Sequence, residues 1–379
     1  MHQNGAPVPT IHADAPPGAG DLLRAYRAGA FFLSTPDGVL LAGNLGAPLT
    51  TVAAARVALT RGATVVGAIP FDPAAPARLA VAGTVRRAAP WHRRAGRGTP
   101  LAARSWTWRD ADPDVFRDAV TTALSRMDGT GLRKVVLSRV RELTASQPVD
   151  ERDLLTALAD RDPFGYIFAA PLDGRTLLGA SPELLVSRRG TVVLANPLAG
   201  SAPRDRDPVR DGRNATALLS SAKDRREHEL VVTAVADGLS PLCRRVAVPA
   251  PELLPTRTMW HLSTRITAEV PDDVSAIELA TALHPTPAVC GDPTPDARVL
   301  IDELEPFDRG FYTGIAGWTD ATGDGDWVVA IRCGEVAGSS LRVYAGAGIV
   351  PGSTPDAELA ETAAKFRTFL SALGIEEDG

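Results

Sequence analysis

The chain has 379 residues, of which 45% are hydrophobic and 22% are charged, and its formal net charge is −5. This composition is ordinary for a globular protein with a sizeable core, and the acidic balance argues against a nucleic-acid or membrane-surface binder. No stretch approaches the run of about 18 apolar residues that a membrane span needs. We therefore expect neither a nucleic acid nor a membrane as a partner.

The three cysteines, Cys243, Cys290 and Cys333, have neither metal-ligand spacing nor an even count. Reduced thiols and a cytoplasmic location are the simplest interpretation. Residues 1–20 lack the basic and apolar regions of a signal peptide, and we expect a disordered or frayed tail there. Residues 21–375 have no long linker and predict a single domain.

Between residues 21 and 110, short strand-like runs surround an alanine-rich helix candidate near 50–61. A second helix is predicted to begin at Pro113, with Asp112 as its N-cap. It leads directly into "KVVLSRV", a strand candidate. In a strand, successive side chains alternate between faces, so Lys134 shares one face with Val136 and Ser138.

The rest of the chain shows the same order of elements twice. After a helix near 150–160, four short alternating segments separated by turn residues indicate an antiparallel meander, and a helical block follows. The last third repeats this scheme and ends in a helix that starts at Pro355, capped by Ser353 or Thr354. We predict an α+β fold in which helices pack on two stacked antiparallel sheets.

Lysine is rare in this chain and occurs only at positions 134, 223 and 365, whereas Lys and Arg together number 40. Arginine stays protonated in proteins, but a buried lysine can lose its proton and act as a base or nucleophile. The three lysines are therefore candidates for positions where an ammonium group is required.

The last helix carries Glu358, Glu361 and Lys365 on one face. Alone, this spacing describes a surface helix with one Glu361–Lys365 ion pair. However, Lys223, Asp224 and Glu227 form a similar face on another predicted helix. Hard oxygen ligands from two helices, with room for water and a carboxylated ligand, suit Mg²⁺.

Three further features suggest a binding pocket. Glu183 is at the start of an apolar strand. If its side chain faces inward, burial raises its pKa, as a general acid needs. A glutamate exposed at the edge of a sheet explains this position equally well. Arg332 lies among apolar residues, where a guanidinium requires an anion. The stretch 344–353 offers glycine backbone N–H groups before a helix N-terminus, which can hold an anion.

Several motifs together resemble one family. In chain order from about 130 to 371 they are "KVVLSR", "LLGASPELLVS", "ANPLAGSAPR", "KDRREHELV", "LHPTPA", "ELEPFDRGFYTGIAGW", "WVVAIRCGEV" and "AGAGIVPGSTPDAELAETAAKF". They are similar to siderophore-type isochorismate synthases of the chorismate-utilising superfamily, which includes anthranilate, aminodeoxychorismate and salicylate synthases. The match extends to "VVGAIPFDP" at 65–73 but is weak in 1–60 and 75–110.

The resemblance implies a reaction in which chorismate binds Mg²⁺, water adds at C2 and the C4 hydroxyl leaves. It assigns Lys134 as the general base for water and Glu183 as the general acid for the leaving hydroxyl. Glu227 and Glu361 would ligate Mg²⁺ directly, with Asp224 and Glu358 contributing through water. The implied substrate-binding residues are Gly200, His284, Arg332, Tyr344, Gly346, Gly348 and Lys365, although His284 by itself is more typical of a structural histidine.

The resemblance also bears on the product and the pathway. The segments "LAGSA" and "LHPTPA" favour isochorismate as the product, made by a monomer for 2,3-dihydroxybenzoate or salicylate siderophores, with an isochorismatase acting downstream. A salicylate synthase, which also eliminates pyruvate, is the alternative. An inactive chorismate-binding relative, or a structural domain with acidic helices, is the third possibility.

Overall fold

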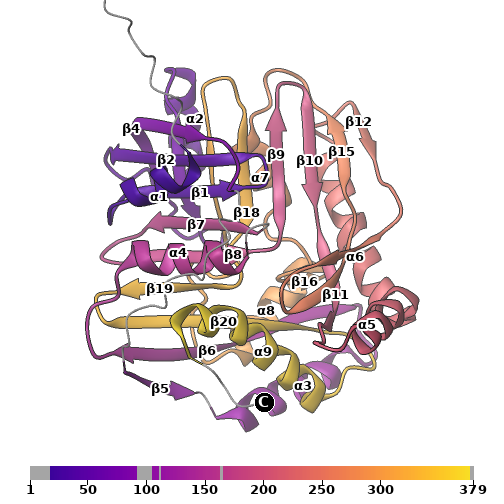
Figure 1. Cartoon of the computed structure of the whole chain (residues 1–379). Coiled ribbons are helices and arrows are strands. Elements are labelled where there is room, and N and C mark those ends of the chain that lie inside the picture. Colours follow the sequence, from indigo (N-terminus) through magenta and orange to yellow (C-terminus); the bar gives the residue numbers. More distant parts are fainter. Residues whose placement is uncertain (1–17, 92–104, 111, 163–164, 376–379) are drawn as a thin grey trace, which may run out of the picture.

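The structure is a computed structural model that describes residues 18–91, 105–110, 112–162 and 165–375. Every strand pairing among these residues is antiparallel, and helices cover the outer faces of the strands (Figure 1). Of the predicted tail, residues 1–17 lie outside the described part, whereas Ala19 and Gly20 already belong to the first helix. The arginine-rich segment "WHRRAGR" at 91–97, except Trp91, also lies outside it.

Two sets of strands form the body of the molecule. The first set runs in spatial order β5 (Trp106–Asp110), β6 (Lys134–Ala145), β20 (Ser340–Ile349), β19 (Cys333–Ala337), β8 (Thr176–Ser181), β7 (Tyr166–Pro171), β1 (Phe31–Thr35), β2 (Gly38–Leu45) and β4 (Arg78–Ala88). The short β16 (Gly291–Asp292) pairs with the start of β6.

The second set continues from β4. It runs β3 (Val65–Ile69), β17 (Ile315–Thr319), β18 (Gly325–Val329), β9 (Leu184–Arg189), β10 (Val192–Asn196), β15 (Ile266–Glu269) and β12 (Arg245–Ala247). Because β4 pairs with β2 along one half and with β3 along the other, the two sets form one continuous sheet, which has 17 strands within the described ranges. A separate three-stranded sheet consists of β11 (Leu198–Pro203), β14 (Met259–Ser263) and β13 (Glu252–Pro255).

Alternation along the strands shows that the two sets are stacked. In β1, Phe31 and Leu33 join an interior cluster that also contains Val66 of β3 and Val328 of β18. Phe32 points the other way, into a second cluster beneath helices. Since successive strand residues face opposite sides, the interior cluster lies between the two sets. The predicted α+β fold with stacked antiparallel strands is confirmed.

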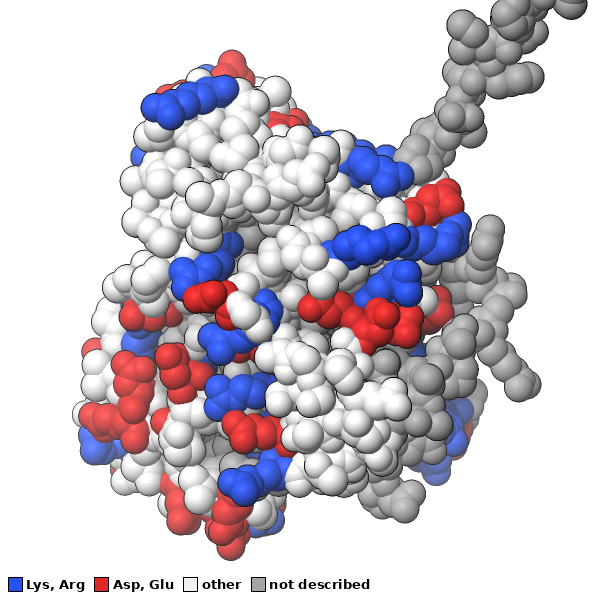
Figure 2. Space-filling view, turned by 90° about the vertical axis from the view of Figure 1, so that its left-hand side faces the viewer, with Lys and Arg blue, Asp and Glu red and all other residues white. Residues whose placement is uncertain are grey.

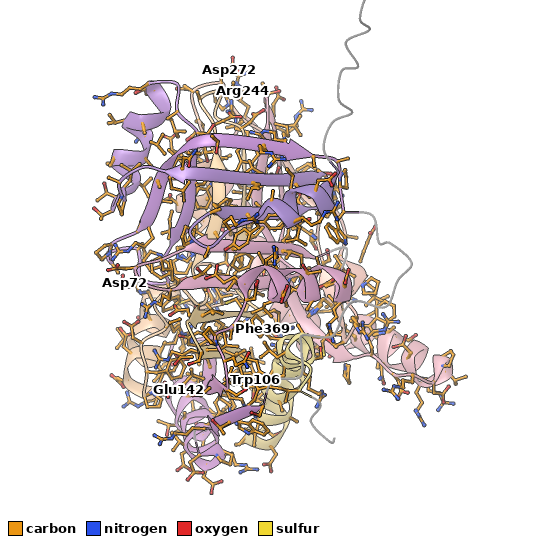
Figure 3. The ribbon with its side chains drawn as sticks, turned by 60° about the vertical axis from the view of Figure 1, so that its left-hand side comes forward. Asp72, Trp106, Glu142, Arg244, Asp272 and Phe369 are labelled. Atoms are coloured by element: carbon orange, nitrogen blue, oxygen red, sulfur yellow. The ribbon has the colours of Figure 1, made fainter. Side chains whose placement is uncertain are left out.

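The helices pack on the outer faces in groups. The first set is covered by α1 (Ala19–Ala25), α4 (Glu151–Arg161), α9 (Pro355–Leu370) and the 3-10 turn η1 (Ser371–Leu373); the second by α2 (Val52–Thr60), α6 (Ala222–Leu239) and α7 (Ala276–Leu283). At the end of β6 and β20 lie α3 (Pro113–Met127) and α8 (Thr294–Leu304), and α5 (Pro208–Ser220) packs on the small sheet. Figure 3 shows this part of the molecule in side view, with Trp106 and Glu142 on the paired strands β5 and β6 and Phe369 on α9.

Local sequence signals account for several helix ends. The Asp112 side chain accepts a hydrogen bond from the Asp114 amide at 3.0 Å, as an N-cap does. Pro355 occupies the first turn of α9, where Thr354 is the N-cap residue. The predicted helical block near 215–239 is two helices, because Ser221 ends α5 and caps α6 by accepting from the Asp224 amide.

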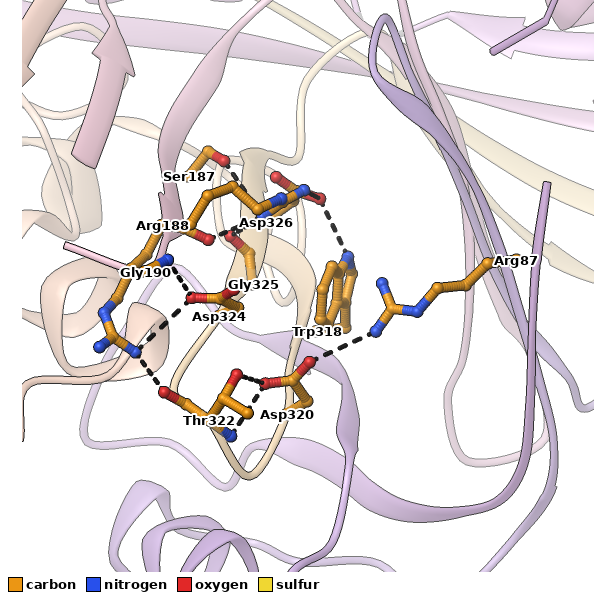
Figure 4. A network of polar contacts seen from close by, with 11 residues as sticks. Arg87, Ser187, Arg188, Gly190, Trp318, Asp320, Thr322, Asp324, Gly325 and Asp326 are labelled. Atoms are coloured by element: carbon orange, nitrogen blue, oxygen red, sulfur yellow. Dashed lines mark hydrogen bonds and ion pairs between the residues drawn. The ribbon is translucent and has the colours of Figure 1, made fainter. Parts of the chain in front are cut away.

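Polar contacts stabilise the far end of the second set. Arg188 donates to the Thr322 carbonyl at 2.7 Å and lies 3.8 Å from Asp324, which accepts from the Gly190 amide (Figure 4). Trp318 of β17 donates to Asp326 of the adjacent strand β18. Charges of both signs are interspersed on the face shown in Figure 2. No helix in the described part of the chain is long and apolar enough to cross a bilayer.

Candidate active site

A pocket lies where β20 and the start of β9 meet the small sheet and helices α6 and α9. It encloses about 840 Å³ of space free of protein atoms, part of it open to solvent. The pocket brings together most of the predicted site residues: Glu183, Gly200, Asp224, Glu227, Arg332, Tyr344, Gly346, Gly348, Glu361 and Lys365. These residues come from parts of the chain that are far apart in sequence.

Lys134, the first residue of β6, lies against the pocket wall. Its side chain is 1% exposed, and its Nζ lies 2.9 Å from Glu227 Oε1. The register of β6 and β20 brings Gly348 beside this pair: a Cβ at Gly348 would lie 2.5 Å from Glu227 Oε1 and 3.0 Å from Lys134 Cε. The missing side chain at 348 therefore makes room for the ion pair.

The other two lysines also pair with glutamates of the acidic helices. Lys223 Nζ on α6 lies 3.3 Å from Glu358 Oε1 on α9. Lys365 Nζ lies 2.6 Å from Glu361 Oε1 and donates to the Gly346 carbonyl at 2.7 Å. Each of the three lysines in the chain thus neutralises one glutamate at or beside the pocket.

The acidic side chains interact electrostatically. Burial raises the pKa of Asp224, and the neighbouring carboxylates of Glu227 and Glu361 raise it further. Burial also raises the pKa of Glu358, with a contribution from Glu361. For Glu361, burial acts in the same direction, but Lys365, Lys223 and Arg332 together lower its pKa. The four carboxylates therefore share one electrostatic environment, in which a further cation would be favoured.

Carboxylate oxygens on two facing helices are the donor type that Mg²⁺ prefers. The residues present therefore fit such an ion in chemistry and in placement. In the structure, each glutamate is held by a lysine, and no three acidic, histidine or cysteine side chains among the described residues are already arranged as metal ligands.

Glu183 lies immediately before β9, and its side chain is buried. The Ser181 hydroxyl accepts from the Glu183 amide at 3.1 Å, and the Leu198 amide donates to Glu183 Oε1 at 3.5 Å. Burial raises the pKa of Glu183 to about 7, although the Leu198 amide and the cationic side chains nearby oppose this shift. A carboxyl group with this pKa is partly protonated at neutral pH and can donate a proton.

The pocket also has an anion-binding character. The Arg332 guanidinium is buried and makes no ion pair or hydrogen bond with any described residue, and burial lowers its pKa. Tyr344 stacks on Tyr312 with ring centroids 4.8 Å apart. A Cβ at Gly346 would lie 2.9 Å from the Tyr312 hydroxyl, so this strand offers backbone rather than side chains to the pocket. A buried guanidinium without a protein anion is suited to a carboxylate ligand.

Comparisons with known proteins agree with this geometry. Residues 84–374 match the model of the chorismate binding enzymes. This chain belongs to that family. Isochorismate synthase DhbC of Bacillus subtilis is 47% identical over 94% of this chain and 97% of its own, and isochorismate synthase EntC of Escherichia coli K12 is 41% identical over 82% of this chain and 81% of its own.

Solved structures of chorismate binding enzymes and their relatives share the fold. A protein assigned as the 2,3-dihydroxybenzoate-specific isochorismate synthase DhbC of Bacillus anthracis superposes with a TM-score of 0.88 at 41% identity, covering 94% of this chain and 99% of that one. Anthranilate synthase component I of Streptococcus pneumoniae superposes with a TM-score of 0.71 at 21% identity, covering 91% and 90%, which shows the fold alone. The resemblance to siderophore-type isochorismate synthases is confirmed.

Three of the predicted site residues do not line the pocket. Lys134 and Glu358 contact residues that do line it, Glu227 and Lys223. His284 is different: its Nε2 lies 2.8 Å from the Pro70 carbonyl oxygen, and the structure does not bring it to the pocket. We therefore leave His284 out of the proposed site.

The sequence interpretation also missed residues that the pocket contains. Ser201 donates to Glu361 Oε1 at 3.4 Å, and His261 on β14 lies opposite Ser201 in the register of the small sheet. Neither stands out in the sequence, because a serine or histidine in a short strand is common. The signal in the sequence is the i,i+3 spacing of the acidic residues, and this spacing identifies site residues on the helices but none on the small sheet.

Proposed function

We propose that this protein is an isomerase that converts chorismate to isochorismate with Mg²⁺. In this reaction, water adds at C2, the ring double bonds shift and the C4 hydroxyl leaves, so the atoms of one water molecule enter and leave. The observation that carries the proposal is the pocket itself. It joins the buried acid Glu183, the Lys134–Glu227 pair and the guanidinium of Arg332, which pairs with no described residue.

Chorismate is a dicarboxylate, and the pocket can hold it through cationic and backbone groups. Arg332 has no protein anion among the described residues, and Lys365 is fixed near β20 by its bond to the Gly346 carbonyl. We infer that these two cations, with the backbone of Gly346 and Gly348 and the Tyr344 side chain, bind the carboxylates. Gly200 has φ 77°, and a Cβ there would lie 3.0 Å from the Asp224 Cβ, so a glycine lets β11 approach α6 closely at the pocket. We infer that Gly200 lies close to the substrate ring.

Two side chains would carry the proton transfers. Glu183, with a pKa of about 7, would protonate the leaving C4 hydroxyl. Lys134 would take a proton from the attacking water, and this role requires the neutral amine. Lys134 Nζ lies 2.9 Å from Glu227 Oε1, so a cation that engages Glu227 would free the Lys134 side chain for this step.

The acids on α6 and α9 are the residues that would hold Mg²⁺. We infer that Glu227 and Glu361 bind it directly, with Asp224 and Glu358 contributing through water. When bound, the ion supplies positive charge that attracts and orients a substrate carboxylate. The same engagement of Glu227 would release Lys134 from its ion pair.

The similar relatives suggest the metabolic context. Their names connect them with 2,3-dihydroxybenzoate and vibriobactin. We infer that isochorismate from this protein feeds 2,3-dihydroxybenzoate or salicylate siderophores, with an isochorismatase as the next enzyme. A salicylate synthase remains the alternative that product analysis must test, because it would use the same acid, base and metal residues.

The test is incubation of the purified protein with chorismate, with and without added Mg²⁺, followed by chromatography of the products. Isochorismate that forms only with Mg²⁺ supports the proposal, whereas salicylate with pyruvate assigns the alternative activity. Chorismate that binds but is not converted indicates an inactive binding relative. The matched controls are the Glu183→Gln and Lys134→Ala variants, which should lose turnover while circular dichroism shows that they remain folded.

A further inference from the structure

Glu305 and Arg309 form a buried ion pair beside strand β6. Their side chains are 3% and 2% exposed, and Arg309 Nη2 lies 2.6 Å from Glu305 Oε1. Glu305 is the C-cap residue of α8, and Arg309 lies in the loop that follows. Neither residue lines the pocket, and the proposed proton transfers use neither. Burial alone would lower the pKa of Arg309, but Glu305 raises it, so the guanidinium stays charged.

The five N–H groups of the Arg309 side chain all have acceptors. Two of them donate to Glu305, Nε to Oε2 at 2.8 Å and Nη2 to Oε1 at 2.6 Å. The others donate to the Val136 carbonyl at 2.7 Å, to the Val289 carbonyl at 2.8 Å and to the Thr313 hydroxyl at 3.3 Å. Val136, Val289 and Thr313 all line the pocket. One guanidinium therefore connects three separate segments of the pocket wall.

Along part of β6, the ion pair supplies the hydrogen bonds that a neighbouring strand would supply. On this edge, β16 pairs with the first two residues of β6, and β5 pairs with its last five. Between these strands, the Val136 carbonyl accepts from Arg309, and the Ser138 amide donates to Glu305 Oε1 at 2.7 Å. The pair thus fixes the main chain of β6 two and four residues after Lys134.

Thr313 lies in a backbone conformation that its own side chain disfavours. Its φ is 58°, and a β-branched residue with positive φ is an outlier that the surrounding structure must hold in place. The Thr313 amide donates to the Ala330 carbonyl at 2.8 Å, and its hydroxyl accepts from Arg309. The guanidinium is therefore one of the groups that hold this part of the wall in its conformation.

Stability alone does not require a charged pair at this place. Replacement of a buried ion pair by apolar residues of similar volume is often neutral or stabilising. An apolar pair, however, has no groups that could bind the main chain of β6 or the Val289 carbonyl. What the charged pair provides is a fixed arrangement of these segments around the pocket.

Resting on the proposed function, we propose that Glu305 and Arg309 are positioning residues for the general base and hold β6 so that Lys134 faces the substrate. They touch neither substrate nor metal and transfer no proton. Arg332 and Lys365, which would bind the carboxylates, lie on other segments, before β19 and on α9. Loss of the pair should therefore lower kcat more than it raises KM.

The test variant is Arg309→Lys, which keeps the buried charge but carries its donors on one nitrogen and cannot bridge the three segments. Displacement of a reacting group by about 1 Å can cost roughly 100-fold in rate, so we expect kcat to fall about 10- to 100-fold with KM within about threefold. In the Lys134→Ala background, where there is no base to position, the same substitution should lower kcat by less than about threefold. Losses that multiply in the double variant would overturn the proposal.

A second readout does not depend on turnover. Because lysine occurs only at positions 134, 223 and 365, protein labelled with ¹³C at lysine Cε gives three NMR signals, and Lys134→Ala identifies the signal of Lys134. Arg309→Lys adds one new signal and should shift that of Lys134. An unshifted Lys134 signal or an unchanged kcat in Arg309→Lys, shown by circular dichroism to be folded, would contradict the positioning role.

Arg188→Lys is the matched control. Arg188 is also a buried arginine that bridges distant carbonyls, since it donates to Thr322 at 2.7 Å and to Asp272 at 3.2 Å, but it lies outside the pocket. This variant should have a lower melting temperature, because these carbonyls lose their partner. Its kcat and its Lys134 signal should equal those of the wild type, and a loss of kcat as large as in Arg309→Lys would count against the proposal. If the wild type makes no isochorismate, the proposed function fails, and the NMR signals still decide whether the pair holds Lys134.

Discussion

Lys134 Nζ lies 2.9 Å from Glu227 Oε1, and this pair joins the candidate base to the candidate metal ligand. Strand β6 provides the lysine and helix α6 the glutamate, while Gly348 on β20 packs against both. The two proposed roles are therefore coupled. Whatever engages Glu227 changes the environment in which Lys134 can give up its proton.

The first prediction concerns Gly348→Ala. The new Cβ would lie 2.5 Å from Glu227 Oε1, so the ion pair must shift. Displacement of a reacting group by about 1 Å can cost roughly 100-fold in rate, and we expect a loss of that order in kcat. Gly131→Ala is the control, because a Cβ there meets no atom within 4 Å. Equal activity of the two variants would show that the tight packing at 348 is irrelevant to turnover.

The second prediction tests the protonation state of Lys134. Lys134→Arg keeps the positive charge but cannot deprotonate at neutral pH. We expect it to be as inactive as Lys134→Ala, with each losing about 10²–10⁴-fold in turnover. Near-normal turnover by Lys134→Arg would remove the base role. Because Glu227 remains in both variants, divalent-ion binding measured by calorimetry should persist and show that the site is still folded.

The third prediction concerns pH and Glu183, whose folded-state pKa is raised to about 7 from 4.5. The general acid must be protonated, so turnover should fall as the pH rises through about 7. Glu183→Gln should lose about 10²–10⁴-fold in activity, and its residual rate should not fall as the pH rises through about 7. A wild-type rate that stays constant from pH 6 to 8 would contradict the acid role.

The same pKa shift predicts a change in stability. Because the folded pKa is raised, the protonated Glu183 contributes stability that is fully present below pH 4.5 and is lost as the pH rises towards about 7. The difference in unfolding free energy between wild type and Glu183→Gln should therefore shift against the wild type across this range. Denaturant unfolding at pH 4.5, 6 and 7.5 measures this difference in unfolding free energy. A difference that stays the same at all three pH values would show that Glu183 has an ordinary pKa in the folded protein.

The fourth prediction concerns competition between a lysine and a metal ion. Lys223 neutralises Glu358, so Lys223→Met should leave the acidic helices more negative and increase the affinity for Mg²⁺. An ion pair with one partly exposed partner contributes about 0.2–1 kcal/mol, which corresponds to about a 1.5- to 5-fold change. Calorimetry without substrate measures it. Arg210→Met, which breaks a surface pair with Asp205 outside the pocket, should leave Mg²⁺ affinity unchanged. Weaker binding by Lys223→Met would mean that Lys223 supports the metal site.

Local patterns in the sequence determined much of the structure. Alternation predicted the strand at Lys134, Asp112 and Pro113 predicted the start of α3, and the i,i+4 spacing predicted the Glu361–Lys365 pair that the structure contains. Such interactions lie within one helical turn or one strand, so a short stretch of sequence is enough to specify them.

Other contacts were decided only by the tertiary structure. Lys223 is spaced to pair with Glu227 on its own helix, yet it pairs with Glu358 on α9, because Glu227 is engaged by Lys134 from β6. The same holds for the histidines: packing places His261 at the pocket and turns His284 towards Pro70. The register of β6 with β20 and the docking of α6 beside α9 bring these distant residues together. These contacts join residues that are far apart in the sequence, so no periodic pattern within a short stretch of sequence predicts them.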